Sequence, residues 1–144
     1  MNFVSESYEL YPEEKCQELV KEGLSKIEKG DVSSAIKIFK EMQKFFPNYT
    51  KTHLYLANLY SIQDEKQEAL KSYSLAWEQR DKFEEQEKHY VPYQSIFILL
   101  SMDQIPKDLL KTWIERAEDF YFDYSINERI IIDFAKQVIQ RKSE

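Results

Sequence analysis

Apolar positions along the chain recur at spacings of three and four residues, which is the period of an α-helix with one buried face. The segment from Ala35 to Met42 shows this spacing, with apolar residues at 35, 36, 39 and 42. The same period continues from residue 12 to near the end of the chain. The pattern therefore predicts an all-α protein of about seven antiparallel helices joined by short links.

Residues that start and stop helices stand where this pattern breaks. Proline with acidic neighbours favours the first turn of a helix, and Pro12 is followed by two glutamates. Gly30 is expected to end this first helix, and Asp31 to cap a second one that ends at Pro47. Further helices are predicted over about 50–62, over 91–102 and from near Pro106. Two more helices are each expected to begin with a capping box, one of Asp64 and Gln67 and the other, over 126–141, of Ser125 and Glu128.

The chain also matches itself when it is shifted by 34 residues. Small residues then fall on small residues and aromatic residues on aromatic residues. Small side chains let helices approach closely, and the aromatic rings fill the space between neighbouring helix pairs. The matched positions are Gly23 with Ala57, Ala35 with Ala69, and Phe39 with Tyr73.

This pattern resembles the tetratricopeptide repeat family, whose units have this length and a small-x₃-aromatic signature followed by a closing proline. Ala35-x₃-Phe39 with Pro47 fits the second half of one unit, and Ala69-x₃-Tyr73 fits the next. The sequence departs from the family at Glu22, Lys26 and Asp81. The resemblance implies an α-solenoid with clear repeats at about 16–49 and 50–83.

A third, degenerate unit over about 91–124 appears only at an offset of 41 residues. The seven extra residues fall within 78–90, for which we expect a lengthened helix that projects from the array; a solvated charged loop is the alternative. The helix over 125–141 would then cap the last apolar face. Residues 1–11 form an N-terminal arm ahead of a single helical domain over 12–144.

Composition narrows the possible functions. The net charge of −6, without a large Lys/Arg cluster, argues against a nucleic-acid partner. The longest apolar run, 96–100, is too short to span a bilayer, and the start of the chain lacks the features of a signal peptide. One cysteine, Cys16, suits a reducing compartment. We therefore expect a cytoplasmic protein that does not bind membranes.

Residues with catalytic chemistry are sparse. The two histidines, His53 and His89, are far apart, and Glu85 with His89 supplies only half of a metal site. Cys16 has no histidine within its own helical segment, so we expect it to be a small buried apolar residue. The sequence thus predicts no enzyme, no metal site and no cofactor.

In the tetratricopeptide family, the first helix of each pair lines a concave groove. Carried over to this chain, that geometry implies a partner-binding groove for a peptide segment, with Asn58 able to hold a partner backbone. For the first unit, burial in the core is the alternative. The groove positions are Val20, Leu24, Ile27, Leu54, Asn58, Ser61, Ser95, Leu99 and Met102.

A second interaction patch is predicted where aromatic residues crowd together near acidic ones. Its candidates are Trp113, Tyr121 and Phe122. Helical spacing also favours a core role for Trp113, with Phe120 and Tyr124.

The N-terminal arm contains Phe3, Val4, Tyr8, Leu10 and Tyr11 without clear periodicity. Three interpretations stay open for it. The arm is disordered, it folds back into the apolar groove in place of a ligand, or it exchanges between protomers.

Together these features predict a non-enzymatic adaptor or scaffold whose partner is another protein. One alternative is a small chaperone like those of bacterial type III secretion translocators, which are similar in size, acidity and repeat number. A second alternative is a self-associating structural protein, for which a homodimer is possible.

Overall fold

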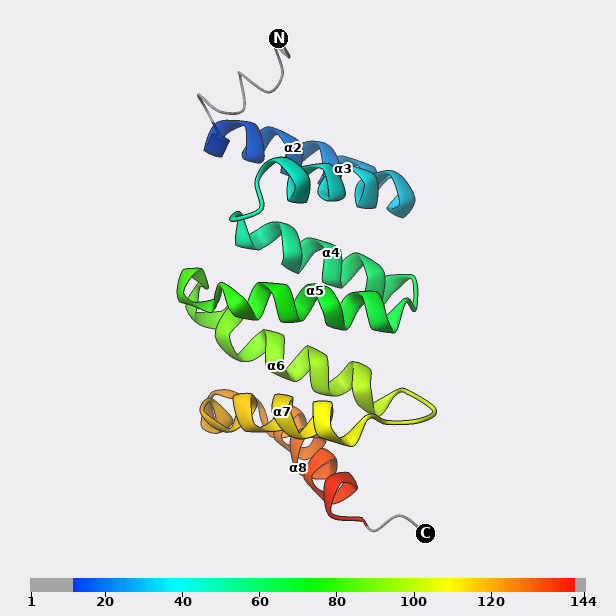
Figure 1. Ribbon diagram of the computed structural model, residues 1–144, viewed down its shortest axis with the longest axis vertical. Helices are drawn as coiled ribbons and strands as arrows, with labels where there is room; N and C mark the ends of the chain where they lie inside the picture. The colour runs from blue at the N-terminus through cyan, green and yellow to red at the C-terminus, as the bar shows by residue number, and fades with distance from the viewer. Residues whose placement is uncertain (1–11, 142–144) are drawn as a thin grey trace. The chain divides into compact units, whose positions relative to one another are not determined.

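The computed structural model describes residues 12–141, and in that range the chain forms α-helices and short 3₁₀ turns with no β-strand. The chain divides into two compact units, the first ending at Gln79 and the second beginning at Arg80. Unit 1 contains α2 (Pro12–Glu28), α3 (Val32–Phe45), α4 (Thr50–Ile62) and α5 (Lys66–Glu78) (Figure 1). Unit 2 contains η1 (Arg80–Lys82), α6 (Glu85–Leu100), α7 (Lys107–Glu118), η2 (Tyr121–Asp123) and α8 (Ile126–Gln140).

Most predicted helix ends are confirmed. Helix α2 starts at Pro12, and α4 covers the predicted range. The carboxylate of Asp31 accepts a hydrogen bond from the Ser34 backbone N–H at 3.1 Å and so caps α3. Ser125 and Glu128 form the predicted capping box of α8, each side chain accepting a backbone N–H of the other residue.

The predicted capping box of Asp64 and Gln67 is wrong. Asp64 has a φ of 61°, in the left-handed region, and follows the end of α4. Its backbone N–H donates to the Ser61 carbonyl, and that of Glu65 donates to the Tyr60 carbonyl. Asp64 therefore closes the C-terminus of α4, and Glu65 precedes α5 without a side-chain cap.

Residues 78–90 contain a turn followed by the start of a lengthened helix, so each of the two expectations holds for part of the segment. Helix α5 ends at Glu78, η1 makes a single tight turn, and α6 already begins at Glu85. A capping box of Glu84 and Glu87, which the sequence analysis did not identify, starts α6. The additional residues are therefore divided between the η1 turn and a longer N-terminal end of α6.

Unit 1 is held by close contacts between its successive helices. The Gly23 backbone on α2 lies against the ring of Phe39 on α3, so closely that a Cβ atom on Gly23 would come within 2.6 Å of the ring. Ala35, Ala57 and Ala69 are completely buried, as expected for the small residues of the repeat. Thr50, the first residue of α4, donates a hydrogen bond from its Oγ1 to the side-chain oxygen of Gln79, which follows α5, at 2.7 Å.

The core of unit 2 lies among α6, α7 and α8. Trp113 on α7 is completely buried, and the Arg116 guanidinium lies 4.5 Å from the centre of its ring. Tyr124 is 2% exposed and donates a hydrogen bond to the His89 carbonyl at 2.6 Å. This contact connects the chain after η2 to the first turns of α6.

Candidate partner-binding surfaces

The predicted groove positions on α2 are partly accessible. Leu24 is 39% exposed, and Val20 and Ile27 are half-buried. These residues form an apolar stripe along α2, because they follow one another at spacings of three and four. The stripe is accessible without any change in the structure.

On α4 the accessible face is rotated from the predicted one. Leu54 is only 7% exposed, and this burial removes its side chain from the surface. Asn58 is half-buried, and its side-chain oxygen accepts a hydrogen bond from Tyr73 at 2.5 Å. That bond engages an acceptor that was expected to serve a partner backbone.

Ile62, at the end of α4, is 67% exposed and was not among the predicted groove positions. Ser61 beside it is exposed as well, and Tyr55 is half-buried. The Tyr55 ring stacks on Phe39 with ring centres 4.9 Å apart. Tyr55, Asn58 and Ile62 share one face at helical spacing, and that spacing was available from the sequence.

Two predicted positions on α6 are removed from the candidate surface. Ser95 and Leu99 are both completely buried, and Ser95 Oγ donates to the Val91 carbonyl at 2.9 Å. Met102 lies beyond the end of α6 and is half-buried. A partner cannot contact Ser95 or Leu99 in this conformation.

The accessible side of α6 is aromatic. Phe97 is 52% exposed and Tyr90 is 36% exposed, with Tyr93 between them in the sequence. The Tyr93 ring centre lies 6.3 Å from that of Phe97 and 6.0 Å from that of Tyr124. This aromatic stripe at spacings of three and four was not identified from the sequence.

In the predicted aromatic patch, the structure separates Trp113 from the other two candidates. Trp113 belongs to the core, as its helical spacing favoured, and contributes no surface. Phe122 is 83% exposed, and Tyr121 is half-buried with its ring edge-on to Phe122 at 5.3 Å. Helix α8 adds further exposed apolar side chains, namely Ile126, Ile130 and Phe134.

Charged residues surround Tyr121. Its hydroxyl donates to both carboxylate oxygens of Asp133 at 2.9 Å, and this bond raises the pKa of the phenol above its usual value. The Lys136 ammonium lies 4.8 Å from the centre of the Tyr121 ring and pairs with Glu118. The pairing places both signs of charge beside the half-buried Tyr121 ring.

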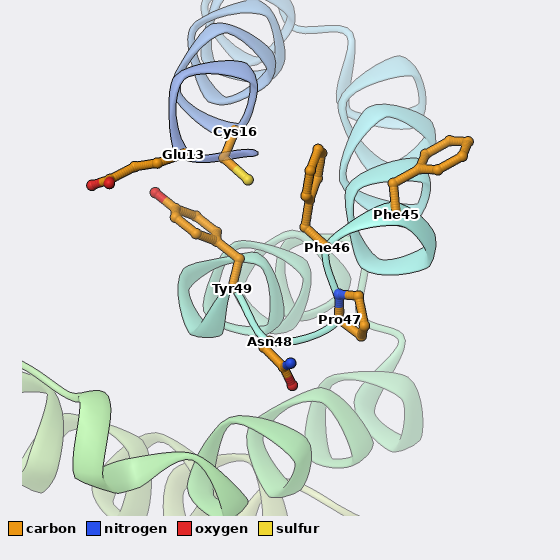
Figure 2. A pocket seen from close by; sticks show the side chains of 7 residues that line it. All are labelled: Glu13, Cys16, Phe45, Phe46, Pro47, Asn48 and Tyr49. Atoms are coloured by element: carbon orange, nitrogen blue, oxygen red, sulfur yellow. The ribbon is translucent and has the colours of Figure 1, made fainter. Parts of the chain in front are cut away.

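An open pocket of about 460 Å³ lies in unit 1 where α2 and α4 begin and α3 ends. Figure 2 shows the Cys16 sulfur and the Phe46 and Tyr49 side chains around the hollow. Burial, with a smaller contribution from Glu13, raises the pKa of the Cys16 thiol to about 11. Cys16 is 2% exposed, in agreement with the expectation of a small buried apolar residue.

The remaining lining residues of the pocket are Glu13, Phe45, Pro47 and Asn48. They come from the first turn of α2 and from the end of α3 with the link that follows it, 32 to 35 residues after Glu13. No local sequence pattern identifies a pocket assembled in this way.

The two histidines lie in different units. His53 is buried in unit 1, where its Nδ1 is 3.2 Å from Gln43 Nε2, and burial lowers its pKa. His89 packs its ring edge-on against Tyr124 at 5.3 Å. Glu85, its expected helix neighbour, pairs with Lys88 at 3.3 Å. Across residues 12–141, no three His, Cys, Asp or Glu side chains are grouped so as to hold a metal ion.

None of the helices that the structure describes has the length and apolar character needed to cross a bilayer.

Comparison with known proteins gives a structural match without a sequence match. No family model and no curated protein sequence matches the chain. The crystal structure of PcrH in complex with the chaperone binding region of PopD matches with a TM-score of 0.62 and 16% sequence identity. The match covers 89% of this chain and 90% of that one. At this identity the likeness shows the fold, and the chain is an all-α, tetratricopeptide-like helical repeat protein.

Proposed function

We propose that this chain is a non-enzymatic module that binds a peptide segment of another protein on the α2 and α4 surface of unit 1. The observation that carries the proposal is the exposure of apolar side chains there, above all Ile62 at 67% and Leu24 at 39%. In a helical repeat most large apolar side chains are buried in the core between the helices, whereas these two remain outside it. Apolar side chains that remain outside the core are available to a partner.

The supporting surface has the chemistry of a peptide groove. Val20, Leu24 and Ile27 offer apolar area along α2, while Ser61 adds an exposed hydroxyl group on α4. Apolar anchors with a few polar contacts suit a partner helix or extended segment that buries two or three apolar side chains. PcrH, which has a similar fold, was crystallised with a region of a partner protein.

A more specific candidate is a small cytoplasmic chaperone that keeps such a segment soluble, as proposed from the resemblance to type III translocator chaperones. The PcrH complex with the chaperone binding region of PopD favours this candidate. It predicts that the partner aggregates when expressed alone and stays soluble when the two chains are co-expressed. An adaptor has no such effect on its partner's solubility.

The proposal is tested by affinity capture from the source organism's cytosol, followed by mass spectrometry. The test variant is Leu24→Glu/Ile62→Glu, which places charge on the proposed surface at exposed positions. The matched control is Ile126→Glu/Ile130→Glu on α8, where the side chains are 72% and 59% exposed. Circular dichroism first confirms that both variants are folded. A partner lost only by the first variant supports the proposal, and one kept by it contradicts the proposal.

A further inference from the structure

Helix α8 has a buried side and, opposite to it, an apolar side that is open to solvent. Its buried residues are Ile132, Ala135 and Val138, and the helix packs on α7 and α6. On the opposite side Ile126 and Ile130 are more than half exposed, and Phe134 is 43% exposed. These three residues follow one another at intervals of four, so they form one continuous stripe along the helix.

Such a stripe is unusual on a helix that faces water. A surface helix normally directs its charged and polar side chains outward and its apolar ones into the core. Adjoining apolar side chains that stay exposed mark a contact with another molecule. No other part of residues 12–141 covers the stripe, which is therefore accessible to a second protein.

The charges along one border of the stripe indicate which protein fits it. Arg129 and Asp133 lie on this border, one helical turn apart. The Arg129 guanidinium donates to the Tyr124 carbonyl at 3.1 Å, and the Asp133 carboxylate accepts from the Tyr121 hydroxyl at 2.9 Å, so their own chain holds both charges in place. When two copies of a helix pack antiparallel, the same border of each meets in reversed order. Arg129 of each copy then lies opposite Asp133 of the other.

The apolar stripe fits a copy of itself in the same orientation. Ile130 is at its centre, so a two-fold axis there places Ile130 against Ile130 and Ile126 against Phe134 of the second copy. Helix α8 has 15 residues and is therefore about 22 Å long. Two helices of this length bury less than the roughly 800 Å² per protein of a standard stable interface, so the contact is expected to be weak.

We propose that this protein forms a two-fold symmetric dimer in which the α8 helices of two copies pack antiparallel through this stripe. The expected dissociation constant is on the order of tens of micromolar. The inference does not depend on the function proposed for the α2 and α4 surface, because it concerns unit 2 and needs no other protein. Ile126→Glu/Ile130→Glu is then expected to be monomeric while unit 1 still binds its segment, so the two proposals fail separately.

The first test is sedimentation equilibrium of the wild type at concentrations from about 1 to 500 µM. Ile130→Glu brings two carboxylates together at the two-fold axis, and is expected to weaken dimerisation at least about 100-fold. The matched control, Leu109→Glu, places the same charge at an exposed apolar position on α7 and is expected to dimerise like wild type. A wild type that stays monomeric throughout, or an Ile130→Glu variant that dimerises like wild type, overturns the proposal.

A second test examines the antiparallel arrangement through the two border charges. Arg129→Asp and Asp133→Arg each place like charges opposite one another in their own dimers, and each is expected to dimerise about tenfold more weakly than wild type. An equal mixture of the two variants pairs opposite charges again, so a mixed dimer about as stable as that of wild type is expected. Circular dichroism first confirms that both variants are folded. A mixture that associates no better than either variant alone overturns the proposal.

Discussion

The backbone of Gly23 on α2 and the ring of Phe39 on α3 touch so closely that no side chain fits between them. A Cβ atom on residue 23 would lie 2.6 Å from Phe39 Cζ and 2.7 Å from Cε2. The Phe39 ring cannot move aside easily, because it is completely buried and one of its faces stacks on the Tyr55 ring. The contact explains why a glycine stands in the middle of a helix, where alanine is favoured by about 1 kcal/mol.

Gly23→Ala is therefore predicted to destabilise unit 1. The overpacking cost of about 1–3 kcal/mol exceeds the gain in helix propensity. Urea denaturation followed by circular dichroism measures the change, with the exposed Glu22→Ala as the helix control. Adding Phe39→Leu to Gly23→Ala makes room for the new methyl group, so the two substitutions together cost less than the sum of their separate effects. Additive costs would contradict this account of the contact.

The left-handed backbone at Asp64 gives a second prediction. Glycine adopts a positive φ without the steric cost that a side chain incurs, so Asp64→Gly is expected to raise the free energy of unfolding by about 0.5 kcal/mol. If Asp64 instead capped α5, the same substitution would lower it. Gln67→Ala also distinguishes the two roles of Asp64. The substitution would destabilise the protein if Gln67 belonged to a capping box, and we expect it to leave stability unchanged. Thermal denaturation measures both variants.

Trp113 and Phe122 were predicted together as one patch, but truncation of Trp113 is expected to cost much more stability than truncation of Phe122. Trp113→Ala removes a completely buried ring and is predicted to cost about 3–5 kcal/mol. Phe122→Ala alters a side chain that is 83% exposed and is predicted to change stability by less than about 0.5 kcal/mol. Chemical denaturation of the two variants measures the contrast. A large loss for Phe122→Ala would show that the residue contributes to the core.

Stability is also predicted to fall on acidification because of His53. Burial lowers its pKa in the folded chain below the ordinary value of about 6.5, so the unfolded chain binds the proton more readily. Above about pH 6.5 His53 is neutral in both the folded and the unfolded chain, so it adds no pH dependence to the stability. As the pH falls from about 6.5 through the folded pKa, protonation of the unfolded state increasingly favours unfolding. His53→Gln is expected to remove this part of the pH dependence, which urea titrations at pH 7.5 and 5.5 measure.

The sequence was sufficient to predict the helices but not the faces that they expose. Helix ends follow from local chemistry, so Pro12, Asp31 and the Ser125–Glu128 pair predicted them correctly. Asp64 misled because the same residue type serves both as an N-cap and as the left-handed residue after a helix. Local sequence alone does not distinguish these two roles when one helix follows another within a few residues.

The choice of face failed most clearly on α6. Helix α6 carries apolar side chains on all sides, so their spacing does not indicate which side is buried. These side chains include Val91, Ile96, Phe97 and Leu99. Positions transferred from the family by a shifted alignment then fell on Ser95 and Leu99, both of which are buried. The pocket around Cys16 was beyond prediction for another reason, since it is assembled from segments distant in the sequence.

The most direct measurement of the central claim is the affinity for the captured partner segment, determined by isothermal titration calorimetry. Wild type is compared with Leu24→Glu/Ile62→Glu and with Ile126→Glu/Ile130→Glu. Loss of two buried apolar contacts and burial of two charges is expected to weaken binding to the first variant by at least about 100-fold, which corresponds to about 2.7 kcal/mol. The α8 variant is expected to bind like wild type. Unchanged affinity for the first variant, or a loss confined to the α8 variant, would contradict binding on the α2 and α4 surface.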